Sequence, residues 1–274
     1  MTQAPGIQRC MLVQWCMSAQ LFSEAKFRQE IRRIYRDNEV EMQEIIESIN
    51  NSLATYSLEL RSIMDQITGE RMWALSNTTA DSISIAATPY SSNELPILKS
   101  LVEEIYTERA GNYALSLHSA LKYATEKGPA GFTKTNAEAL ISRFCQDDWL
   151  SRDNSGYIVL GARAAIELRS FLADGFGDYQ RQCALCSESA TRGIVCPECS
   201  AVVHPYCAER IASSVDGNQL SCPGCHQQMV RPRRFGAGEA GVPHVFEATQ
   251  ADSVNLTQQG RKRVMEDSED EDDE

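Results

Sequence analysis

Cys183-Ala-Leu-Cys186, Cys196-Pro-Glu-Cys199, His204-Pro-Tyr-Cys207 and Cys222-Pro-Gly-Cys225 are four pairs of potential metal ligands. Each pair has two residues between its members, and a Cys-x-x-Cys turn presents two sulfurs to one cation. Two such pairs complete a tetrahedral zinc shell, so these eight side chains predict two zinc ions. The spacing alone leaves open which pairs share an ion.

The competing interpretation of these cysteines is a disulfide framework. Such a framework belongs to oxidising compartments, and no apolar signal segment follows Met1. A histidine at ligand spacing also favours metal over disulfides. With four protein ligands each, both shells would be closed, and closed zinc shells stabilise folds rather than hydrolyse substrates. The segment is short and poor in hydrophobic residues, so we expect loss of one ligand to unfold it.

The length of 274 residues is enough for two or three domains, and 42% hydrophobic residues is typical of globular proteins. No apolar run reaches the roughly 20 residues that span a bilayer, so no membrane role is expected. Cys10, Cys16 and Cys145 lie in apolar helical patterns and are predicted to be core thiols. We therefore expect an intracellular, reducing compartment.

Helical periodicity of apolar residues predicts three helices in the first part of the chain. The first covers 7–18, Ser23 can cap a second over 24–36, and a third spans about 39–52. Arginines on the outer side of the second helix indicate a solvated face, with a surface for nucleic acid or an acidic partner as the alternative. The predicted inward residues are Ile7, Met11, Trp15 and Met17, then Phe27, Ile31, Ile34 and Tyr35, then Val40, Met42, Ile45, Ile46 and Ile49. The outward arginines are Arg28, Arg32, Arg33 and Arg36.

The next pattern is that of a β-hairpin. Residues 57–65 alternate, with Leu58, Leu60 and Ile63 facing inward, and 71–76 are the predicted partner strand. The turn lies at 67–70. A short helix over 79–87 is expected to close the unit. Three helices followed by a hairpin are typical of a winged helix, which we predict for residues 1–90.

The same order repeats over residues 91–175. Helices are predicted over 93–108, 114–126 and 136–147, the last capped by Thr135 after a break at 127–131. A strand beginning at Trp149, a turn at 153–156 and a strand over 157–160 form the second hairpin, and a final helix covers 161–173. The predicted inward residues are Leu95, Leu98, Leu101, Val102, Ile105, Leu115, Leu117, Leu121, Tyr123, Ala139, Leu140, Phe144 and Cys145.

Charge argues against DNA as the direct ligand of these two units. The helix over 136–147 is the one that would enter a DNA groove, and it carries Glu138 and Arg143 and is followed by Asp147 and Asp148. This balance repels phosphate, which supplies most non-specific DNA affinity. Both winged helices are therefore predicted to dock proteins, with DNA contacted at most indirectly through partners.

The C-terminal part is divided by composition. Residues 174–178 are a predicted linker, 180–232 the zinc module and 233–274 a disordered tail. Residues 264–274 contain eight acids and no base, so the net charge of −12 becomes −4 for the remainder of the chain. Arg261-Lys262-Arg263 is a weak nuclear import signal, and Ser268 is a candidate for acidic-directed phosphorylation.

The ligand string of four cysteines, one histidine and three cysteines resembles RING and PHD fingers. In their cross-brace, alternate pairs share an ion. That resemblance implies one site of Cys183, Cys186, His204 and Cys207, and a second of Cys196, Cys199, Cys222 and Cys225. A histone-reading PHD finger usually has an aromatic residue two positions before the seventh ligand. Here that residue is Leu220, and Tyr206 is the one aromatic residue between Cys183 and Cys225, which disfavours a methyl-lysine cage.

A RING ligase binds a ubiquitin-conjugating enzyme and positions its thioester without forming a covalent intermediate. The carrier usually docks on an apolar residue inside the first Cys pair and on a proline in the last, which match Leu185 and Pro223. Ile194 and Val195 are possible neighbours. Active RINGs often have Arg or Lys directly after the last ligand, whereas His226 and then Gln227 stand there, and neither carries a fixed charge at neutral pH.

Tandem winged helices followed by such a RING and an acidic tail resemble the family of the first non-SMC element, the RING subunit of the SMC five–six complex. The likeness covers residues 7 to about 230. Beyond the zinc ligands it rests on Asn93-Glu94-Leu95, the passage from Phe144 to Leu150 and the segment Leu160–Ala164. The resemblance implies a nuclear protein that pairs with a MAGE-type subunit and a kleisin subunit in DNA repair and recombination. It also implies ubiquitin ligase activity stimulated by the MAGE-type partner.

We therefore expect an α+β protein with two winged helices, a RING-like cross-brace holding two structural zinc ions, and a disordered acidic tail. The expected function is that of a RING-type ubiquitin ligase subunit, weak without its partner. The alternatives are an architectural subunit whose RING only stabilises the complex, and a PHD-like chromatin reader.

Overall fold

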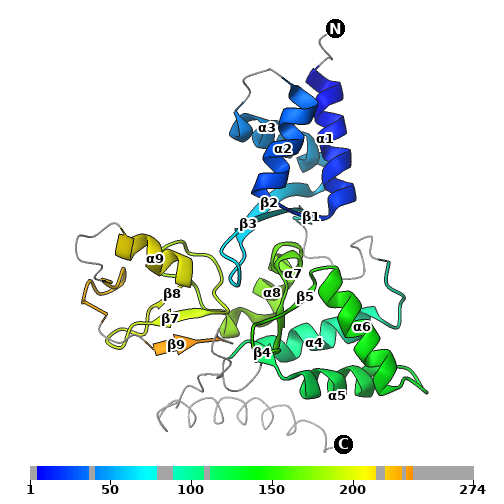
Figure 1. The fold of residues 1–274 in the computed structure, drawn as a ribbon, viewed down its shortest axis with the longest axis vertical. Coiled ribbons are helices and arrows are strands. Elements are labelled where there is room, and N and C mark those ends of the chain that lie inside the picture. The colour runs from blue at the N-terminus through cyan, green and yellow to red at the C-terminus, as the bar shows by residue number, and fades with distance from the viewer. Residues whose placement is uncertain are drawn as a thin grey trace, which may run out of the picture. The chain divides into compact units, whose positions relative to one another are not determined.

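The computed structural model describes residues 5–36, 41–78, 89–107, 112–213, 220–229 and 233–236, which all belong to one compact unit, Met1–His244. Three antiparallel sheets of three strands each organise this part of the chain, and helices pack against them (Figure 1). Within the described ranges, no helix combines the length and the apolar character needed to cross a bilayer.

The first sheet has the strand order β1-β3-β2 and is covered by three helices (Figure 1). The elements follow in the order helix, strand, helix, helix and hairpin. This is the predicted order of three helices and a hairpin, with one short strand, β1, that was not predicted. The β2–β3 hairpin is the wing, and Leu60 pairs with Leu75 at its centre. The elements are α1 (Pro5–Ala19), β1 (Leu21–Ser23), α2 (Glu24–Tyr35), α3 (Met42–Leu53), β2 (Leu58–Met64) and β3 (Arg71–Asn77).

Local side-chain chemistry fixes the starts and contacts of these elements. Ser23 caps α2 as predicted, because its hydroxyl accepts a hydrogen bond from the backbone N–H of Lys26. The side chain of Asn50 in α3 accepts from the N–H of Leu60 at 2.7 Å and donates to its carbonyl at 3.2 Å, which ties α3 to the wing. Phe22, Phe27 and Trp73 form an aromatic core between helices and sheet.

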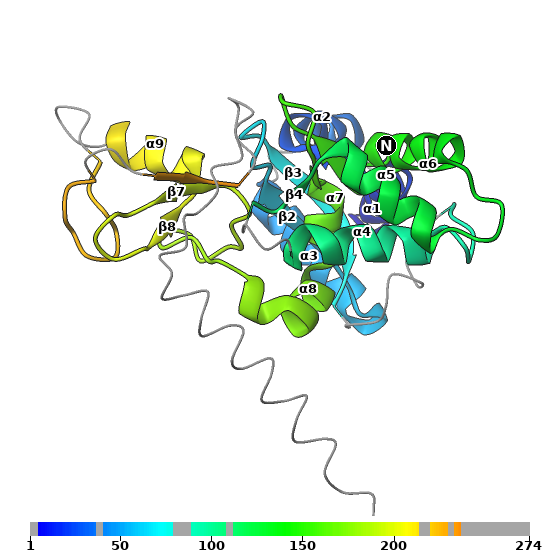
Figure 2. The same cartoon turned by 90° about the horizontal axis from the view of Figure 1, so that it is seen from below.

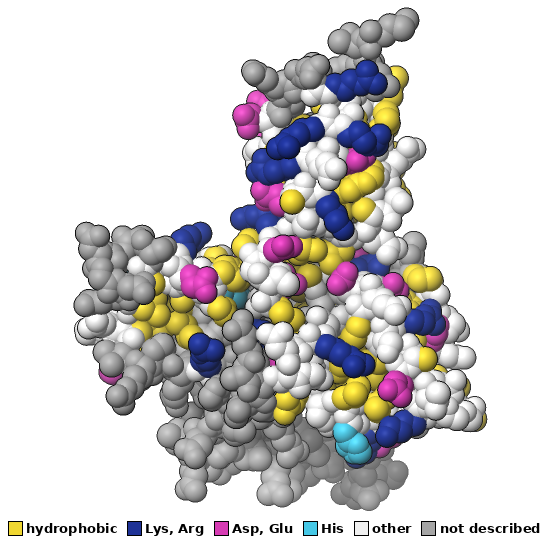
Figure 3. All heavy atoms as spheres, in the orientation of Figure 1, with side chains coloured by type: hydrophobic (Ala, Val, Ile, Leu, Met, Phe, Trp, Pro, Cys, Tyr) yellow, Lys and Arg dark blue, Asp and Glu magenta, His cyan; other side chains and the backbone are white. Residues whose placement is uncertain are grey.

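The arginine-bearing side of α2 is exposed, as predicted for Arg28, Arg32, Arg33 and Arg36. Arg28 pairs with Glu24 and Arg33 with Glu30 on the same helix. Figure 3 shows the basic side chains of this unit interspersed with acidic and neutral ones. This distribution is that of a solvated helix face.

The predicted inner stripe of α1 is wrong at Ile7 and Met17, while Met11 and Trp15 are half-buried against the core as predicted. Ile7 and Met17 are 53% and 60% exposed, whereas the buried positions are Gln8, Leu12 and Cys16. Gln8 takes an inward place because its amide donates to the carbonyl of Ile34 in α2. A polar residue on the buried face shifted the apparent phase of the apolar pattern.

The thiols of α1 also differ from the prediction, because Cys10 is exposed and only Cys16 is buried. Burial raises the pKa of Cys16 to about 12, and the thiolate is the nucleophilic form. We predict that a thiol reagent such as iodoacetamide modifies Cys10 at neutral pH and leaves Cys16 unmodified until the protein unfolds. Peptide mass spectrometry after timed labelling measures this, and equal labelling of both residues in the folded protein would contradict it.

The second unit repeats the arrangement around a sheet of order β4-β6-β5. Its hairpin turn lies where predicted, because the N–H of Gly156 donates to the carbonyl of Asp153 and Gly156 has a φ of +81°. The elements are α4 (Leu95–Thr107), β4 (Ala114–Leu115), α5 (Leu117–Lys127), α6 (Lys134–Gln146), β5 (Leu150–Arg152), β6 (Ile158–Leu160), α7 (Ala162–Glu167) and α8 (Arg169–Phe176), followed by a 3₁₀ turn at Gly177–Tyr179.

Several predicted helix boundaries in this unit are wrong. Residues 114–115 form β4, because Ser116 caps α5 and ends the strand. The cap of α6 is Thr133 rather than Thr135, since Thr133 and Asn136 form a reciprocal capping box. Of the residues predicted to face inward, Ala139 is exposed and Cys145 half-buried, while Leu140 and Phe144 are buried as predicted. The predicted helix over 161–173 is two helices that meet at Leu168, and α8 extends into the predicted linker as far as Phe176.

Helix α7 of the second unit packs against the wing strands β2 and β3 of the first. Ser76 in β3 donates to the carbonyl of Ile166 at 3.2 Å, and Arg163 donates to the side-chain oxygen of Gln20 at 2.9 Å. The two units are therefore joined through described side-chain contacts.

The C-terminal module contains a third sheet of order β8-β7-β9, and α9 lies along one face of it (Figure 2). Part of the predicted disordered tail belongs to this sheet, because Arg233–Phe235 form β9 and pair with Gly193–Val195. Phe235 is 1% exposed and lies 6.3 Å from the ring of Tyr113. The elements are β7 (Gly193–Val195), β8 (Val202–Val203), α9 (Pro205–Ser213) and β9 (Arg233–Phe235).

Other predicted features fall outside the described residues. They are the short helix over 79–87, Val40 in the third helix, the basic run 261–263, Ser268 and the acidic end of the chain. The predicted domain boundaries at residues 90 and 175 stay predictions, whereas the sheet of the zinc module extends beyond residue 232 to Phe235.

Candidate metal centre

Three of the four ligand pairs lie in turns of the same construction. In each turn, the residue after the second cysteine donates its N–H to the carbonyl of the first cysteine, at 2.8 Å for Ser187, 3.0 Å for Ser200 and 2.9 Å for His226. These three residues have left-handed φ angles of 60°, 59° and 60°. The reversed backbone brings both sulfurs of a Cys-x-x-Cys pair to the same side of the turn.

The fourth pair is presented by a helix. His204 directly precedes α9 and Cys207 lies in its first turn, where the N–H of Ala208 donates to the carbonyl of His204. Residues three positions apart on a helix share a face. The imidazole and the sulfur of Cys207 therefore point in the same direction.

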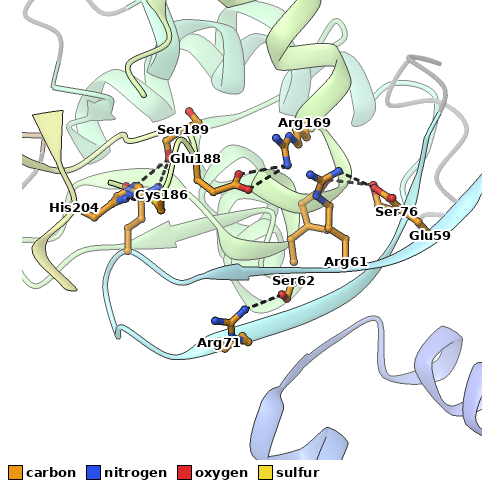
Figure 4. Close-up of polar contacts among 12 residues, drawn as sticks. Glu59, Arg61, Ser62, Arg71, Ser76, Arg169, Cys186, Glu188, Ser189 and His204 are labelled. Carbon is orange, nitrogen blue, oxygen red and sulfur yellow. Dashed lines mark hydrogen bonds and ion pairs between the residues drawn. The ribbon is translucent and has the colours of Figure 1, made fainter. Parts of the chain in front are cut away.

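The first centre brings together Cys183, Cys186, His204 and Cys207, whose ligand atoms all lie within 4.8 Å of one another. The Nδ1 atom of His204 is 3.4 Å from the sulfur of Cys186 and 4.0 Å from that of Cys207. Its Nε2 atom is 3.2 Å from the carbonyl oxygen of Ser189, to which it donates. This second bond fixes the tautomer with Nδ1 free to bind a metal (Figure 4).

Within the first centre the thiolate form is favoured at Cys183, whereas burial and the charge of Cys183 raise the pKa of Cys186 and of Cys207. Burial opposes ionisation of Cys183. Hydrogen bonds from His204 and from nearby backbone N–H groups outweigh this effect and lower the pKa of the Cys183 thiol. A thiolate is the form in which cysteine binds zinc.

The second centre consists of Cys196, Cys199, Cys222 and Cys225, again within 4.8 Å of one another. The sulfurs of Cys196 and Cys225 are 3.7 Å apart, and those of Cys199 and Cys222 are 3.6 Å apart. A disulfide would need about 2.05 Å, and all ten cysteines of the chain are free thiols. The disulfide interpretation is therefore wrong.

These separations match a zinc tetrahedron. With Zn–S bonds of about 2.3 Å and a Zn–N bond of about 2.0 Å, the sulfurs would lie about 3.8 Å apart and sulfur and nitrogen about 3.5 Å apart. The measured distances of 3.4 to 4.0 Å between ligand atoms agree with these values. Both centres can hold zinc, and each offers four protein ligands, as predicted.

The grouping of the ligands is the interleaved one. The first and third pairs meet in one centre and the second and fourth in the other, as the likeness to RING and PHD fingers implied. The ligands also form much of the small core of the module. Val203 and Ala208 pack with Cys183 and Cys207, Met229 packs with Cys196 and Cys222, and Ile194 and Leu220 contact both clusters.

The predicted carrier-docking residues have different environments. Leu185 is half-buried against the cluster of the first centre, and Ile194 is half-buried in β7. Pro223 is half-buried and His226 is exposed, both in the last turn. Val195 is fully buried, so its side chain cannot contact a partner. Docking on the other four residues stays a prediction.

Two residues that the sequence did not indicate, Ser189 and Gln66, support the first metal centre through the ligand His204. Ser189 supplies the carbonyl that orients His204, and Gln66 in the distant wing turn bonds the same carbonyl at 3.1 Å. A glutamine in a turn carries no sequence signal for such a role. A backbone carbonyl carries none at all.

Together, the two units of helices and three-stranded sheets and the interleaved double metal centre define a class of protein: an α+β protein with a RING-like zinc module. Residues 183–225 match the family described as RING-like domain. Residues 9–168 match the family described as the Nse1 non-SMC component of the SMC5-6 complex. The chain belongs to this Nse1 family.

Curated relatives agree with this assignment. The chain is 24% identical over 223 residues to the rat "Non-structural maintenance of chromosomes element 1 homolog", covering 81% of this chain and 79% of the relative. It is 24% identical over 185 residues to element 1 of Schizosaccharomyces pombe, covering 68% and 75%. It is 26% identical to the human homolog over 185 residues, covering 68% of each chain.

A solved structure also shares the fold. A chain of the "Nse1-Nse3-Nse4 complex" superposes with a TM-score of 0.67 at 22% identity, over 84% of this chain and 98% of that chain. This chain therefore shares its fold with one chain of that solved complex.

Proposed function

We propose that this chain is a RING-type ubiquitin ligase subunit of an SMC five–six complex. The observation that carries the proposal is the interleaved pair of closed metal shells in an Nse1-family chain. A closed shell offers no position for substrate or water. The module therefore acts as a rigid docking surface. It binds a ubiquitin-charged conjugating enzyme and restrains the thioester for attack, so catalysis comes from positioning.

The docking surface proposed for the conjugating enzyme includes Leu185 and Pro223, with Ile194 and His226 beside them. Leu185 and Pro223 belong to the first and last ligand turns. They are half-buried, so part of each side chain remains open to a partner. Zinc supplies the folding energy that holds these turns in place when it is bound.

The proposed partners are a MAGE-type subunit, Nse3, and a kleisin subunit, Nse4. The related solved chain comes from an "Nse1-Nse3-Nse4 complex". We further propose a nuclear role in DNA repair and recombination, with DNA contacted through the complex rather than by this chain alone.

A ubiquitylation assay tests the ligase proposal. The full chain, its MAGE-type partner and a set of conjugating enzymes are expected to form ubiquitin chains. The double variant Leu185→Ala, Pro223→Ala should be slower by about tenfold, as is typical of lost interface anchors. The matched control is Pro197→Ala, which alters the corresponding proline of another ligand turn. The proposal fails if the wild type does no better than the double variant while both contain two zinc ions.

An architectural role is the second candidate, and one observation favours it. His226 occupies the position where active RINGs often carry a fixed positive charge, and its left-handed φ of 60° serves the ligand turn itself. A wild-type chain that assembles with its partners but forms no ubiquitin chains with any conjugating enzyme would support this candidate.

The environment of Tyr206 argues against a PHD-like reader. Its ring stacks on the ligand His204, with ring centroids 4.8 Å apart and an interplanar angle of 13°. Leu220 packs against both ligand clusters. Neither side chain is placed to form an aromatic cage for methylated lysine.

A further inference from the structure

The loop Glu188–Arg192 of the zinc module contacts both winged-helix units and the first metal centre. The carboxylate of Glu188 pairs with Arg169 of α8 at 3.4 Å, and Arg192 lies 3.8 Å from Asp153 in the second hairpin turn. The carbonyl of Ser189 accepts from the ligand His204. The fourth contact comes from Gln66, which is 123 residues away in the chain.

Both the oxygen and the nitrogen of the Gln66 side-chain amide form hydrogen bonds with the loop Glu188–Arg192. Its Oε1 atom accepts from the backbone N–H of Thr191 at 3.0 Å, from that of Arg192 at 3.1 Å, and from the Thr191 hydroxyl at 3.2 Å. Its Nε2 atom donates to the carbonyl of Ser189 at 3.1 Å. The two N–H donors require an oxygen and the carbonyl requires a donor, so this network defines the orientation of the amide.

A rigid turn presents Gln66 to the loop. The side chain of Asp65 accepts from the N–H groups of Ile67 and Thr68 at 2.7 and 2.8 Å. The N–H of Gly69, with a φ of +72°, donates to the carbonyl of Asp65. These bonds close the end of the wing, so little backbone entropy remains to be lost when the amide binds.

One carbonyl oxygen therefore joins the wing to the metal centre. The oxygen of Ser189 has two lone pairs, and it accepts from Gln66 at 3.1 Å and from His204 at 3.2 Å. Figure 4 shows Ser189, His204 and Cys186 together beside the wing. A bond of this kind, on the nitrogen away from the metal, orients a histidine ligand.

We propose that Gln66 is a positioning residue of the first metal centre. It holds the Ser189 carbonyl against His204, so that the wing of the first winged helix forms part of the support of a zinc ligand. The metal centre and the attachment of the zinc module to the wing are then energetically coupled. This inference concerns folding and metal retention, and it does not depend on ligase activity.

The other contacts of the loop do not replace Gln66. Arg169 and Glu188 are 42% and 44% exposed, and such surface pairs contribute little. Arg192 and Asp153 are buried, but their ion pair restrains the loop at Arg192 and does not involve the Ser189 carbonyl. Gln66 and His204 both donate to that carbonyl, so Gln66 bonds the same oxygen that orients the ligand.

Two substitutions distinguish the contribution of the Gln66 amide oxygen from that of its nitrogen. Gln66→Ala removes all of its bonds. Gln66→Glu keeps the oxygen that accepts from Thr191 and Arg192 but puts a second carboxylate oxygen against the Ser189 carbonyl, where it repels. Gln29→Ala is the control, because Gln29 is exposed on α2. Each full-length protein is first checked for two zinc ions.

Hydrogen exchange and zinc transfer to a chelating dye report on the loop and the metals. In Gln66→Ala, the amides of Thr191 and Arg192 should exchange roughly tenfold faster. One of the two zinc ions should leave about threefold faster or more, a smaller effect than the 10–100-fold seen for direct outer-shell partners. In Gln66→Glu, those amides should stay protected, while the Nε2–H resonance of labelled His204 should shift.

Each result decides for or against the proposal. Selective loss of one zinc ion and a shifted His204 resonance support a positioning role. Unchanged exchange, zinc release and His204 signal in both variants overturn it. Equal acceleration of both zinc ions, or exchange that rises throughout α4–α6 as well, also overturns it, because either result would show a general loss of stability.

Discussion

Replacing Cys222 with serine is expected to reduce the zinc content from two ions per chain to one or fewer and to unfold the whole zinc module. Cys222 is 1% exposed and belongs to the second centre and to the core cluster with Cys196 and Met229. Structural zinc contributes about 10–16 kcal/mol in zinc-finger peptides. This exceeds what so small a core can replace.

The interleaved grouping makes a sharper prediction for the same variant. The first and third ligand pairs are separated in sequence by the second pair, so loosening the second centre also loosens the chain that closes the first. Hydrogen exchange should therefore lose protection at both Cys183–Ala190 and Val202–Ala208, while α4–α6 stay protected. Zinc content is measured by elemental analysis, and Cys10→Ser, which removes an exposed thiol, is the control. Retained protection around the first centre would contradict the coupling.

The zinc ligands could be predicted from sequence because their chemistry is local. A pair of cysteines two residues apart forms the same turn wherever it occurs, and three such turns share one backbone geometry here. The Ser23 cap and the Asp153–Gly156 turn were predicted for the same reason, since each depends on neighbouring residues. The pairing of the ligands is not local, and it came from resemblance rather than from spacing.

Features that depend on distant contacts could not be predicted. The inner face of α1 is set by the bond from Gln8 to the carbonyl of Ile34, so apolar periodicity gave the helix but the wrong phase. Residues 233–235 have little strand character alone, and β9 exists because the open edge of β7 accepts it and Phe235 is buried. Gln66 belongs to the same class, because its role depends on a loop 123 residues away.

The segment Leu160–Ala164 is one of those on which the family resemblance rests, and its buried arginine, Arg163, contacts both winged-helix units. Arg163 is 4% exposed, its guanidinium lies 4.5 Å from the ring centre of the fully buried Trp149, and it pairs with Glu167 at 2.7 Å. It also bonds Gln20 of the first unit at 2.9 Å. One side chain thus joins the core of the second unit, a partly buried acid and the neighbouring unit.

Arg163→Met is expected to lower the free energy of unfolding by about 3–5 kcal/mol, the usual cost of leaving one member of a buried pair without its partner. Methionine keeps apolar contact with Trp149 but leaves the carboxylate of Glu167 uncompensated. Burial already raises the pKa of Glu167, and Arg163 counteracts that effect. Without Arg163 the pKa in the folded protein rises further above the unfolded value. The loss of stability should therefore be largest at neutral pH and shrink as the pH falls toward about 4.5, the ordinary value for glutamate.

Adding Glu167→Gln to Arg163→Met tests the cause of this loss. The double variant buries no unpaired charge, so it should recover most of the lost stability and show a weaker pH dependence. Urea unfolding at pH 7 and pH 5 measures both effects, with Arg32→Met on the exposed face of α2 as the control. If Arg163→Met is no less stable than that control, or if the double variant is as unstable as the single one, the buried charge is not the cause. A deficit that remains in the double variant would then reflect the contacts of Arg163 with Gln20 and Trp149.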